Sequence, residues 1–325
     1  MDYGFGKVFD NLEEVVQAKL EQVIKDGIED KLGQRLNALE ATQTLIIKQG
    51  SKTKELKGLK HKNLKKLIKL ANANLNILMV GMAGTGKTKG ASQVAEALDL
   101  PFYCMSVGSQ TSKSDILGYM NANGEYIRTA FRDAYENGGI FVMDEIDAGN
   151  SNVLIVLNSA LANDICSFPD KMVKRHQDFR FIATANTYGN GADRTYVGRN
   201  QLDGATLDRF AVINWGIDEA LESALVKPYT KGEVWLKTIR YFRRQVSDLG
   251  LRAIISPRAS IKGAQELELG FKLDDVIESV ILPQMPNDRA NWAIREIKQS
   301  YKDYDKEDQA KKAEEVEQAT QQELL

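Results

Sequence analysis

The chain has 325 residues, with 43 basic and 45 acidic side chains and a formal net charge of −2. This length favours two domains, and the balanced charge excludes a uniformly basic surface for nucleic acid. Two histidines and two cysteines are too few for a zinc cluster or a disulfide framework. The sequence shows neither an apolar run long enough to span a membrane nor the pattern of a signal peptide. We therefore expect a cytoplasmic protein without membrane contact.

The N-terminal part, residues 1–59, is expected to be a helical extension followed by a linker. Apolar side chains in residues 11–47 recur at steps of three, four and seven. This spacing predicts an amphipathic helix or a short coiled coil. Such a helix would pack on its own domain or mediate self-association.

Residues 48–69 are strongly basic, with nine lysines and one acidic residue, Glu55. Gly50 and Ser51 indicate a linker and Gly58 a second break, and an apolar stripe that begins at Leu64 predicts a lysine-covered helix. The lysines are expected to face solvent. The alternative is contact with a phosphate backbone, since clustered lysines release counterions when they bind nucleic acid.

Short apolar runs separated by helical or polar segments follow. Near-continuous apolar strands that alternate with helices are typical of a parallel sheet covered on both faces. Cys104 lies inside one of these runs and is therefore expected in the core. The predicted strands are residues 75–80, 102–107, 139–144, 179–184 and 211–216.

After Trp215 the pattern is helical to about Tyr304. We predict an α/β core over residues 60–216 and a helical domain over 217–305. Residues 306–325 are rich in charge and poor in apolar side chains, which predicts a solvated tail.

A glycine-rich loop follows the first predicted strand. It has the pattern GxxxxGKT and lies at a strand-to-helix turn, the context in which this pattern binds phosphate. The glycines let backbone N–H groups surround phosphate oxygens, and the helix N-terminus adds its positive dipole end. Lys87 supplies a mobile positive charge, and the Thr88 hydroxyl can bind Mg²⁺. The predicted nucleotide-binding residues are Gly81, Met82, Ala83, Gly84, Thr85, Gly86, Lys87 and Thr88.

Two acidic residues, Asp144 and Glu145, come directly after the apolar run 140–143. In an open parallel sheet this places them at the carboxyl ends of the strands, where ligands bind. Asp144 is expected to hold Mg²⁺, usually through water. Glu145 is expected to polarise an attacking water, because phosphoryl transfer depends on positioning and electrostatics.

Asn186 and two arginines are candidates for the same edge. Asn186 ends the fourth predicted strand and can hydrogen-bond a γ-phosphate or a water; a turn-forming role is the alternative. Arg209 precedes the fifth strand, and Arg258 follows Pro257 at the start of a helix. A guanidinium suits a γ-phosphate, with surface ion pairing as the alternative. Because arginine fingers often come from a neighbouring subunit, Arg209 predicts a ring.

This set of motifs resembles AAA+ ATPases of the MoxR branch, and within it the ATPase-subunit type of cobaltochelatase. The resemblance covers about residues 60–270 and is carried by GMAGTGKT, FVMDEID, TANT, LDRF and SPR. It implies a P-loop core with a five-stranded parallel sheet and a helical lid. It also implies ATP and Mg²⁺ as ligands and assembly of identical subunits into a ring, usually a hexamer.

The resemblance further implies residue roles. It makes Asn186 the first sensor, Arg209 the finger that acts on a neighbouring subunit and Arg258 the lid sensor. Arg194 and Arg199 compete with Arg209 for the finger role.

Two hairpins typical of this branch also have candidates. Residues 118–126 contain an Asn-Gly turn, a strong hairpin signal, and residues 168–172 with their flanks form the second. Such hairpins project toward the pore or a partner. Tyr119, Tyr126 and Tyr196 are candidates for substrate contact, with core or turn packing as the alternative.

Three functions follow. The leading one is a ring-forming ATPase that couples ATP binding and hydrolysis to remodelling or assembly of an unknown partner protein. A narrower one is the ATPase subunit of a magnesium or cobalt chelatase, whose partner would be an integrin-like metal-binding protein. The third is a nucleic-acid-acting motor or nucleotide-gated scaffold, suggested by the lysines of residues 48–69.

Overall fold

The computed structural model describes residues 45–49, 52–193 and 195–285, together with Gln299 and Lys306. Most of the predicted N-terminal helix and of the charged tail, and also Arg194, lie outside the described residues. Among the helices that are described, none is long and apolar enough to cross a membrane.

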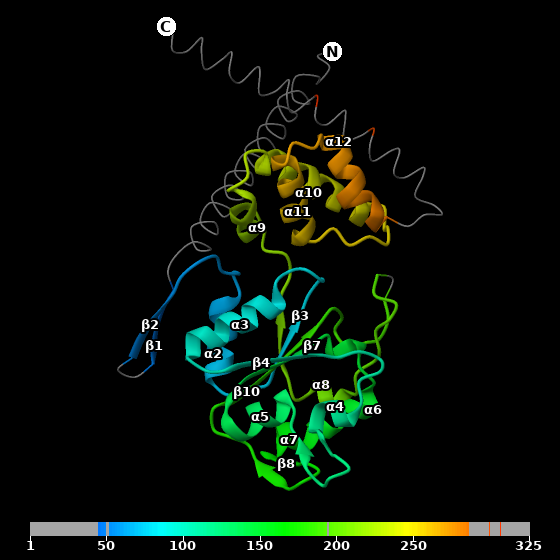
Figure 1. The fold of residues 1–325 in the computed structure, drawn as a ribbon. Coiled ribbons are helices and arrows are strands. Elements are labelled where there is room, and N and C mark those ends of the chain that lie inside the picture. The colour runs from blue at the N-terminus through cyan, green and yellow to red at the C-terminus, as the bar shows by residue number, and fades with distance from the viewer. Residues whose placement is uncertain (1–44, 50–51, 194, 286–298, 300–305, 307–325) are drawn as a thin grey trace, which may run out of the picture.

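A five-stranded sheet lies at the centre of the α/β part (Figure 1). Its strand order is β11-β3-β10-β7-β4, and every pair of neighbours is parallel. The inner strands are apolar because both faces are covered, and all four residues of β3 are buried. These findings confirm the predicted α/β class. The strands are β3 (Ile77–Val80), β4 (Phe102–Ser106), β7 (Gly139–Asp144), β10 (Phe179–Ala185) and β11 (Ala211–Asn214).

Helices cover the two faces of this sheet and bury separate apolar clusters. On one face, α2 and α3 pack against the sheet around Leu67, Val94 and Trp215. On the other face, α5 and α7 contribute Phe131 and Leu157 to a second cluster. The helices of this part are α2 (Leu64–Asn72), α3 (Lys87–Leu98), α4 (Lys113–Leu117), α5 (Ala130–Asn137), η1 (Ile146–Ala148), α6 (Ser151–Leu154), α7 (Val156–Ala162) and α8 (Gly204–Leu207).

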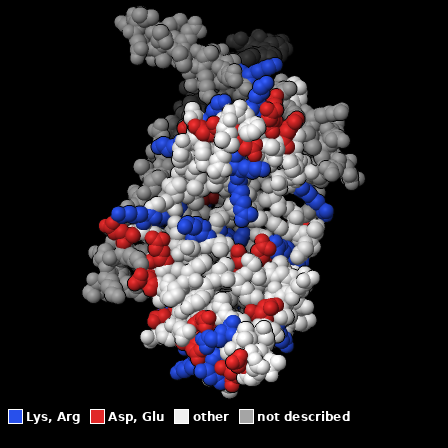
Figure 2. All heavy atoms as spheres, viewed as in Figure 1, with Lys and Arg blue, Asp and Glu red and all other residues white. Residues whose placement is uncertain are grey.

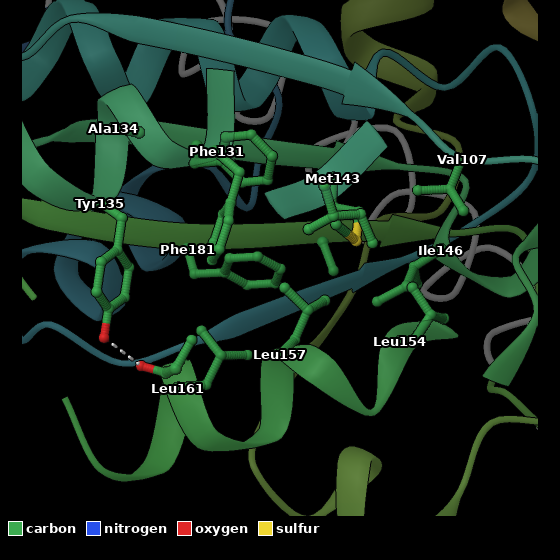
Figure 3. Close-up of a cluster of buried hydrophobic side chains, with 14 of the residues drawn as sticks. Val107, Phe131, Ala134, Tyr135, Met143, Ile146, Leu154, Leu157, Leu161 and Phe181 are labelled. Carbon is green, nitrogen blue, oxygen red and sulfur yellow. Dashed lines mark hydrogen bonds between the residues drawn. The ribbon is translucent and has the colours of Figure 1, made fainter. Parts of the chain in front are cut away.

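The second cluster is rich in aromatic rings (Figure 3). The ring of Phe131 lies edge-on to Phe141 with centroids 5.2 Å apart, and Tyr135 lies edge-on to Phe179 at 5.1 Å. The Tyr135 hydroxyl donates a hydrogen bond of 3.0 Å to the carbonyl of Ala160 on α7. The polar end of this buried ring is thereby satisfied, and α5 is fixed against α7.

Three short antiparallel hairpins are attached to the α/β part. Two confirm the predicted hairpins, and Asn121 stabilises the first of them through its side-chain oxygen, which accepts the N–H groups of Asn123 and Glu125 at 2.9 Å. The hairpins are β1 (Leu45–Gln49) with β2 (Lys52–Leu56), β5 (Tyr119–Met120) with β6 (Tyr126–Ile127), and β8 (Ile165–Ser167) with β9 (Met172–Lys174).

The pair β1–β2 corrects the sequence interpretation, which placed the end of a helix and a linker there. Its register puts Gln49 opposite Lys52, so only Gly50 and Ser51 connect the strands. A two-residue Gly-Ser connection between β-prone runs is a hairpin signal, whereas a linker was expected at these residues. The lysine-covered helix that was expected next is present as α2.

A second correction concerns Cys104. The sequence placed it in the core, but its side chain is exposed. The reason is the sheet order: β4 is an edge strand, hydrogen-bonded only to β7. Burial along β4 therefore alternates, whereas it is continuous along β3.

The remaining described chain is helical and has its own core. Trp235, Ile239 and Phe242 on α10 are buried, and a Cβ on Gly263 of α11 would lie 2.0 Å from the Trp235 ring. This position therefore requires glycine. The helices are α9 (Glu219–Val226), α10 (Gly232–Asp248), α11 (Pro257–Glu268), α12 (Leu273–Val276), η2 (Ile277–Ile281) and η3 (Leu282–Gln284).

A buried carboxylate joins three of these helices. Glu222 on α9 is 1% exposed, and its Oε1 accepts hydrogen bonds of 2.6 Å from Arg243 on α10 and from the Ser260 hydroxyl on α11. Burial disfavours the carboxylate, but these hydrogen bonds and the positive charges of Arg243 and Arg240 together outweigh it, so the pKa of Glu222 lies below its usual value.

We expect Glu222→Ala to lower the free energy of unfolding by about 3–5 kcal/mol, because it leaves the Arg243 charge without its partner inside the helical part. Urea unfolding followed by circular dichroism measures this loss. The control is Glu219→Ala on the same helix, whose side chain is 55% exposed and whose ion pair with Arg240 is long at 3.8 Å. It should cost about 1 kcal/mol or less. Equal losses in the two variants would contradict the prediction.

Candidate functional site

The loop of residues 81–88 connects β3 to α3 at the carboxyl edge of the sheet. Gly84 and Gly86 have φ of +82° and +83°, conformations that favour glycine. Within the described part of the chain, the N–H groups of Gly84, Thr85 and Gly86 have no hydrogen-bond partner. Amides arranged in this way at a helix N-terminus form a cradle suited to phosphate.

Lys87 is the first residue of α3 and is buried. Its Nζ donates to the carbonyl of Gly81 at 2.7 Å, to that of Met82 at 3.2 Å and to Oδ1 of Asn186 at 2.9 Å. Burial lowers the pKa of Lys87 to about 8, although nearby carboxylates, led by Asp144, oppose the shift. The two predicted residues Lys87 and Asn186 are thus in direct contact.

Asp144 ends β7 beside the loop. Its Oδ2 accepts a hydrogen bond of 3.0 Å from the Thr88 hydroxyl, and its Oδ1 accepts one from the Thr184 hydroxyl on β10. Thr88 and Asp144 are the metal ligands predicted from sequence. The Thr88 hydroxyl and the Asp144 carboxylate are therefore in direct contact. Hard oxygens of this kind are the ligands that Mg²⁺ prefers.

Glu145 follows with a left-handed backbone, φ +58°. Its N–H donates to the Thr184 hydroxyl at 3.1 Å, and its carboxylate accepts hydrogen bonds of 3.2 and 3.3 Å from the guanidinium of Arg199. The Glu145 side chain is 47% exposed. An unusual conformation of this kind often marks a functional residue.

Sequence reasoning missed Asp147. This side chain is fully buried, and its Oδ2 accepts the N–H of Asn186 at 3.0 Å, the N–H of Thr187 at 2.9 Å and the Thr187 hydroxyl at 2.9 Å. Asp147 therefore fixes the backbone that carries Asn186. The DEID stretch offered a signal, but only the tertiary fold shows which of its acids points inward.

A cavity of about 440 Å³ lies next to the loop, between the α/β part and the helical part. Its size lies within the usual range for small-ligand sites. The indole N–H of Trp215 donates to the Thr85 carbonyl at 3.2 Å, and the ring stacks on His61 with centroids 4.0 Å apart. Further lining residues include Gly58, Gly84, Glu222, Arg258 and Ile261.

The two arginines predicted for the site, Arg209 and Arg258, differ in their surroundings. Arg258 lines the cavity, and its Cγ would lie 3.2 Å from a Cβ on Gly84. Arg209, which follows α8, instead donates to the carbonyl of Ala205 in that helix and forms no hydrogen bond with the loop among the described residues. The structure therefore brings Arg258, but not Arg209, to the loop of the same chain.

The three candidate tyrosines also have different surroundings. Tyr119 is 51% exposed on β5, whereas the Tyr126 hydroxyl donates to the carbonyl of Leu117 at 2.6 Å, as expected for local packing. The Tyr196 hydroxyl accepts the N–H of Ala83 in the glycine-rich loop at 2.9 Å.

A glycine-rich loop after an inner parallel strand, β3, with acidic residues at the end of β7 on the other side of β10, defines the P-loop α/β class. Residues 76–210 match the AAA domain of the dynein-related subfamily. This part of the chain therefore carries an AAA domain, and it is similar to AAA+ ATPases of the MoxR and cobaltochelatase-subunit type.

Two proteins and one solved structure are similar to this chain. The chain is 31% identical over 153 residues to the aerobic cobaltochelatase subunit CobS of a Sinorhizobium species, which covers 43% of this chain and 46% of that protein. It is 26% identical over 243 residues to an uncharacterized protein of Staphylococcus aureus, and this match covers 69% of this chain and 90% of that protein. It also resembles the structure of NtrX from Brucella abortus in complex with ADP, with a TM-score of 0.48 and 15% identity. This match covers 88% of this chain and 67% of that structure. The chain thus spans about half the length of the cobaltochelatase subunit.

Proposed function

We propose that this protein is a ring-forming ATPase that couples ATP binding and hydrolysis to remodelling or assembly of a partner protein. One observation supports the ATPase part above all others. The amide cradle at Gly84–Gly86, the buried Lys87 ammonium and the Thr88–Asp144 pair meet at one edge of the sheet. These are the groups that bind phosphates and a divalent cation.

In this proposal the loop amides and Lys87 bind the β- and γ-phosphates of ATP. Lys87 exchanges its contacts with the carbonyls of Gly81 and Met82 for phosphate oxygens, which are stronger partners because they are charged. Thr88 and Asp144 would hold Mg²⁺, which supplies charge neutralisation at the phosphates. The cavity beside Trp215 takes the nucleoside.

Glu145 accepts a proton from, and orients, the water that attacks the γ-phosphate. Asn186 lies 2.9 Å from the Lys87 ammonium, so its side chain is within reach of the same phosphate. Asp147 supports it by holding the backbone of residues 186 and 187 in place.

We place Arg258 at the nucleotide from the helical part, as a sensor of lid position. We assign Arg209 as a finger that reaches the site of a neighbouring subunit, because within its own chain its guanidinium donates to the carbonyl of Ala205 and not to the loop. This assignment requires a ring of identical subunits.

The test of nucleotide binding is Lys87→Ala. We expect affinity for ATP to fall at least about 100-fold, because a buried charge-assisted contact with phosphate is lost. Isothermal titration calorimetry measures the change. Lys65→Ala, an exposed lysine on α2, serves as the control and should bind like the wild type. Unchanged affinity in Lys87→Ala would overturn the proposal.

The lowered pKa of Lys87 gives a pH prediction. At pH 8 about half of these amines are neutral in the protein alone, and bound phosphate raises the pKa again. The complex therefore holds more protons than the free protein, so ATP affinity should fall as pH rises from 7 to 9. Calorimetry in buffers of different ionisation enthalpy should detect uptake of about half a proton at pH 8 and close to none at pH 7. Equal uptake at both values would contradict this assignment.

A second candidate is the ATPase subunit of a metal chelatase, favoured by the similarity to CobS. It requires an integrin-like metal-binding partner. Addition of such a partner should raise ATP turnover if this candidate holds.

The nucleic-acid-acting alternative has weaker support. Lys62, Lys65, Lys66 and Lys69 are exposed on or next to α2. Basic and acidic side chains are nevertheless mixed over the face shown in Figure 2, with no continuous basic area on it among the described residues. ATP turnover stimulated by DNA or RNA at moderate salt would favour this alternative.

A further inference from the structure

The loop between β10 and α8 contributes two side chains, Tyr196 and Arg199, that contact the candidate site. Tyr196 places its hydroxyl oxygen 2.9 Å from the N–H of Ala83, and Arg199 places its guanidinium 3.2 and 3.3 Å from Glu145. Each therefore holds a group that the proposed reaction uses.

This loop is held in place by contacts of its own. Oδ1 of Asp193 accepts the N–H groups of Thr195 at 2.7 Å and Tyr196 at 2.6 Å. On the other side, the N–H of Asn200 donates to the Asp147 carbonyl at 2.7 Å. Hydrogen bonds at both ends therefore restrain the segment that carries Tyr196 and Arg199.

Arg199 is shared between two carboxylates. Its side chain is 13% exposed, and Nη1 lies 3.5 Å from Oδ1 of the fully buried Asp147 as well as 3.2 Å from Glu145. Its guanidinium also lies 5.9 Å from the centre of the Tyr196 ring. While the same Glu145 oxygen accepts both hydrogen bonds from the guanidinium, it is not free to accept one from a water.

We propose that Tyr196 and Arg199 couple phosphate binding to the release of Glu145 within one chain. A nucleoside triphosphate takes the Ala83 amide from Tyr196 and attracts Arg199 toward its last phosphate, and Glu145 is then free to act on water. Arg199 is a positioning residue for Glu145 of its own chain, and a triphosphate, not a diphosphate, is the ligand that moves it. This inference rests on the proposed ATPase function.

The physical basis is competition for shared partners. The Tyr196 oxygen and a phosphate oxygen cannot both accept the same Ala83 N–H. The phosphate is the stronger acceptor because it is charged. A guanidinium pairs with phosphate as well as with carboxylate in a two-pronged geometry, so Arg199 can exchange Glu145 for phosphate without losing its ion pair.

The experiment compares affinities for ADP and for a non-hydrolysable ATP analogue, measured by calorimetry with Mg²⁺. Tyr196→Phe removes the competitor for the Ala83 amide and should tighten binding of the analogue about 3- to 10-fold. Arg199→Ala should lower the preference for the analogue over ADP by about tenfold or more. Because Arg199→Ala leaves the buried Asp147 without its cation, Arg199→Lys is measured too and should lose only part of that preference.

Matched controls are available in the chain. Tyr188→Phe changes an exposed tyrosine of the same loop, and Arg244→Ala changes an exposed arginine of α10. Both should leave the two affinities within about twofold of the wild type. The inference is overturned if Tyr196→Phe and both Arg199 variants also stay within that range while the wild type binds nucleotide.

Two further outcomes separate this inference from its alternatives. If Arg199→Ala protein regains ATP turnover when it is mixed with Lys87→Ala protein, Arg199 acts on a neighbouring subunit, and the single-chain inference fails. If the wild type binds neither nucleotide, the proposed ATPase function itself fails, and this inference fails with it.

Discussion

Glu145→Gln is expected to reduce ATP turnover at least about 100-fold while ATP still binds. The amide has nearly the same shape as the carboxylate but cannot accept the proton of the attacking water, and general base catalysis of this kind contributes about 100- to 10,000-fold. The groups assigned to phosphate binding, Lys87 and the amides of Gly84–Gly86, are not changed. Turnover is followed by phosphate release, and binding by calorimetry.

The control for this variant is Glu233→Gln, an exposed position in the first turn of α10. It should turn over ATP like the wild type. Turnover of Glu145→Gln within about threefold of the wild type would rule out the proposed role of Glu145. The same variant should also retain its partner protein in the presence of ATP, so it is the form to use for capture of that partner.

Arg209→Ala is expected to lower turnover by about 1,000-fold or more, the range in which arginine fingers act on phosphoryl transfer. ATP affinity should change much less, because Arg209 forms no hydrogen bond with the loop of its own chain among the described residues. Steady-state turnover and calorimetry separate the two effects. Arg252→Ala, an exposed arginine of the helical part, is the control.

A mixing experiment tests whether Arg209 acts between subunits. Arg209→Ala subunits keep an intact nucleotide site, and Lys87→Ala subunits keep an intact arginine. Each protein alone should be inactive. Mixed assemblies should recover turnover if the arginine of one subunit completes the site of the next. No recovery in demonstrably mixed rings would contradict the finger assignment.

The parts of the site that lie next to one another along the chain could be predicted from sequence. The loop of residues 81–88 and the pair Asp144–Glu145 depend on local patterns, a strand followed by a defined turn. Asn186 was expected at the same edge of the sheet because the carboxyl ends of parallel strands share one edge, and it lies there with its Oδ1 2.9 Å from the Lys87 ammonium.

The contacts that depend on tertiary packing could not be predicted. The roles of Asp147 and of Arg199 arise only when residues about 40–55 positions apart meet. The exposure of Cys104 depends on strand order, which strand composition does not reveal. Arg199 was considered as a finger from a neighbouring subunit, whereas the structure places it on Glu145 of its own chain.

The position of Trp215 has an optical consequence. Its indole donates to the carbonyl of Thr85 in the phosphate loop, its ring stacks on His61, and a Cβ on Gly90 of α3 would lie 2.5 Å from it. Any movement of the loop therefore changes the hydrogen bonding and polarity around this one fluorophore. The emission of Trp215 should report ligand binding without an added label, as the difference between the wild type and Trp215→Phe.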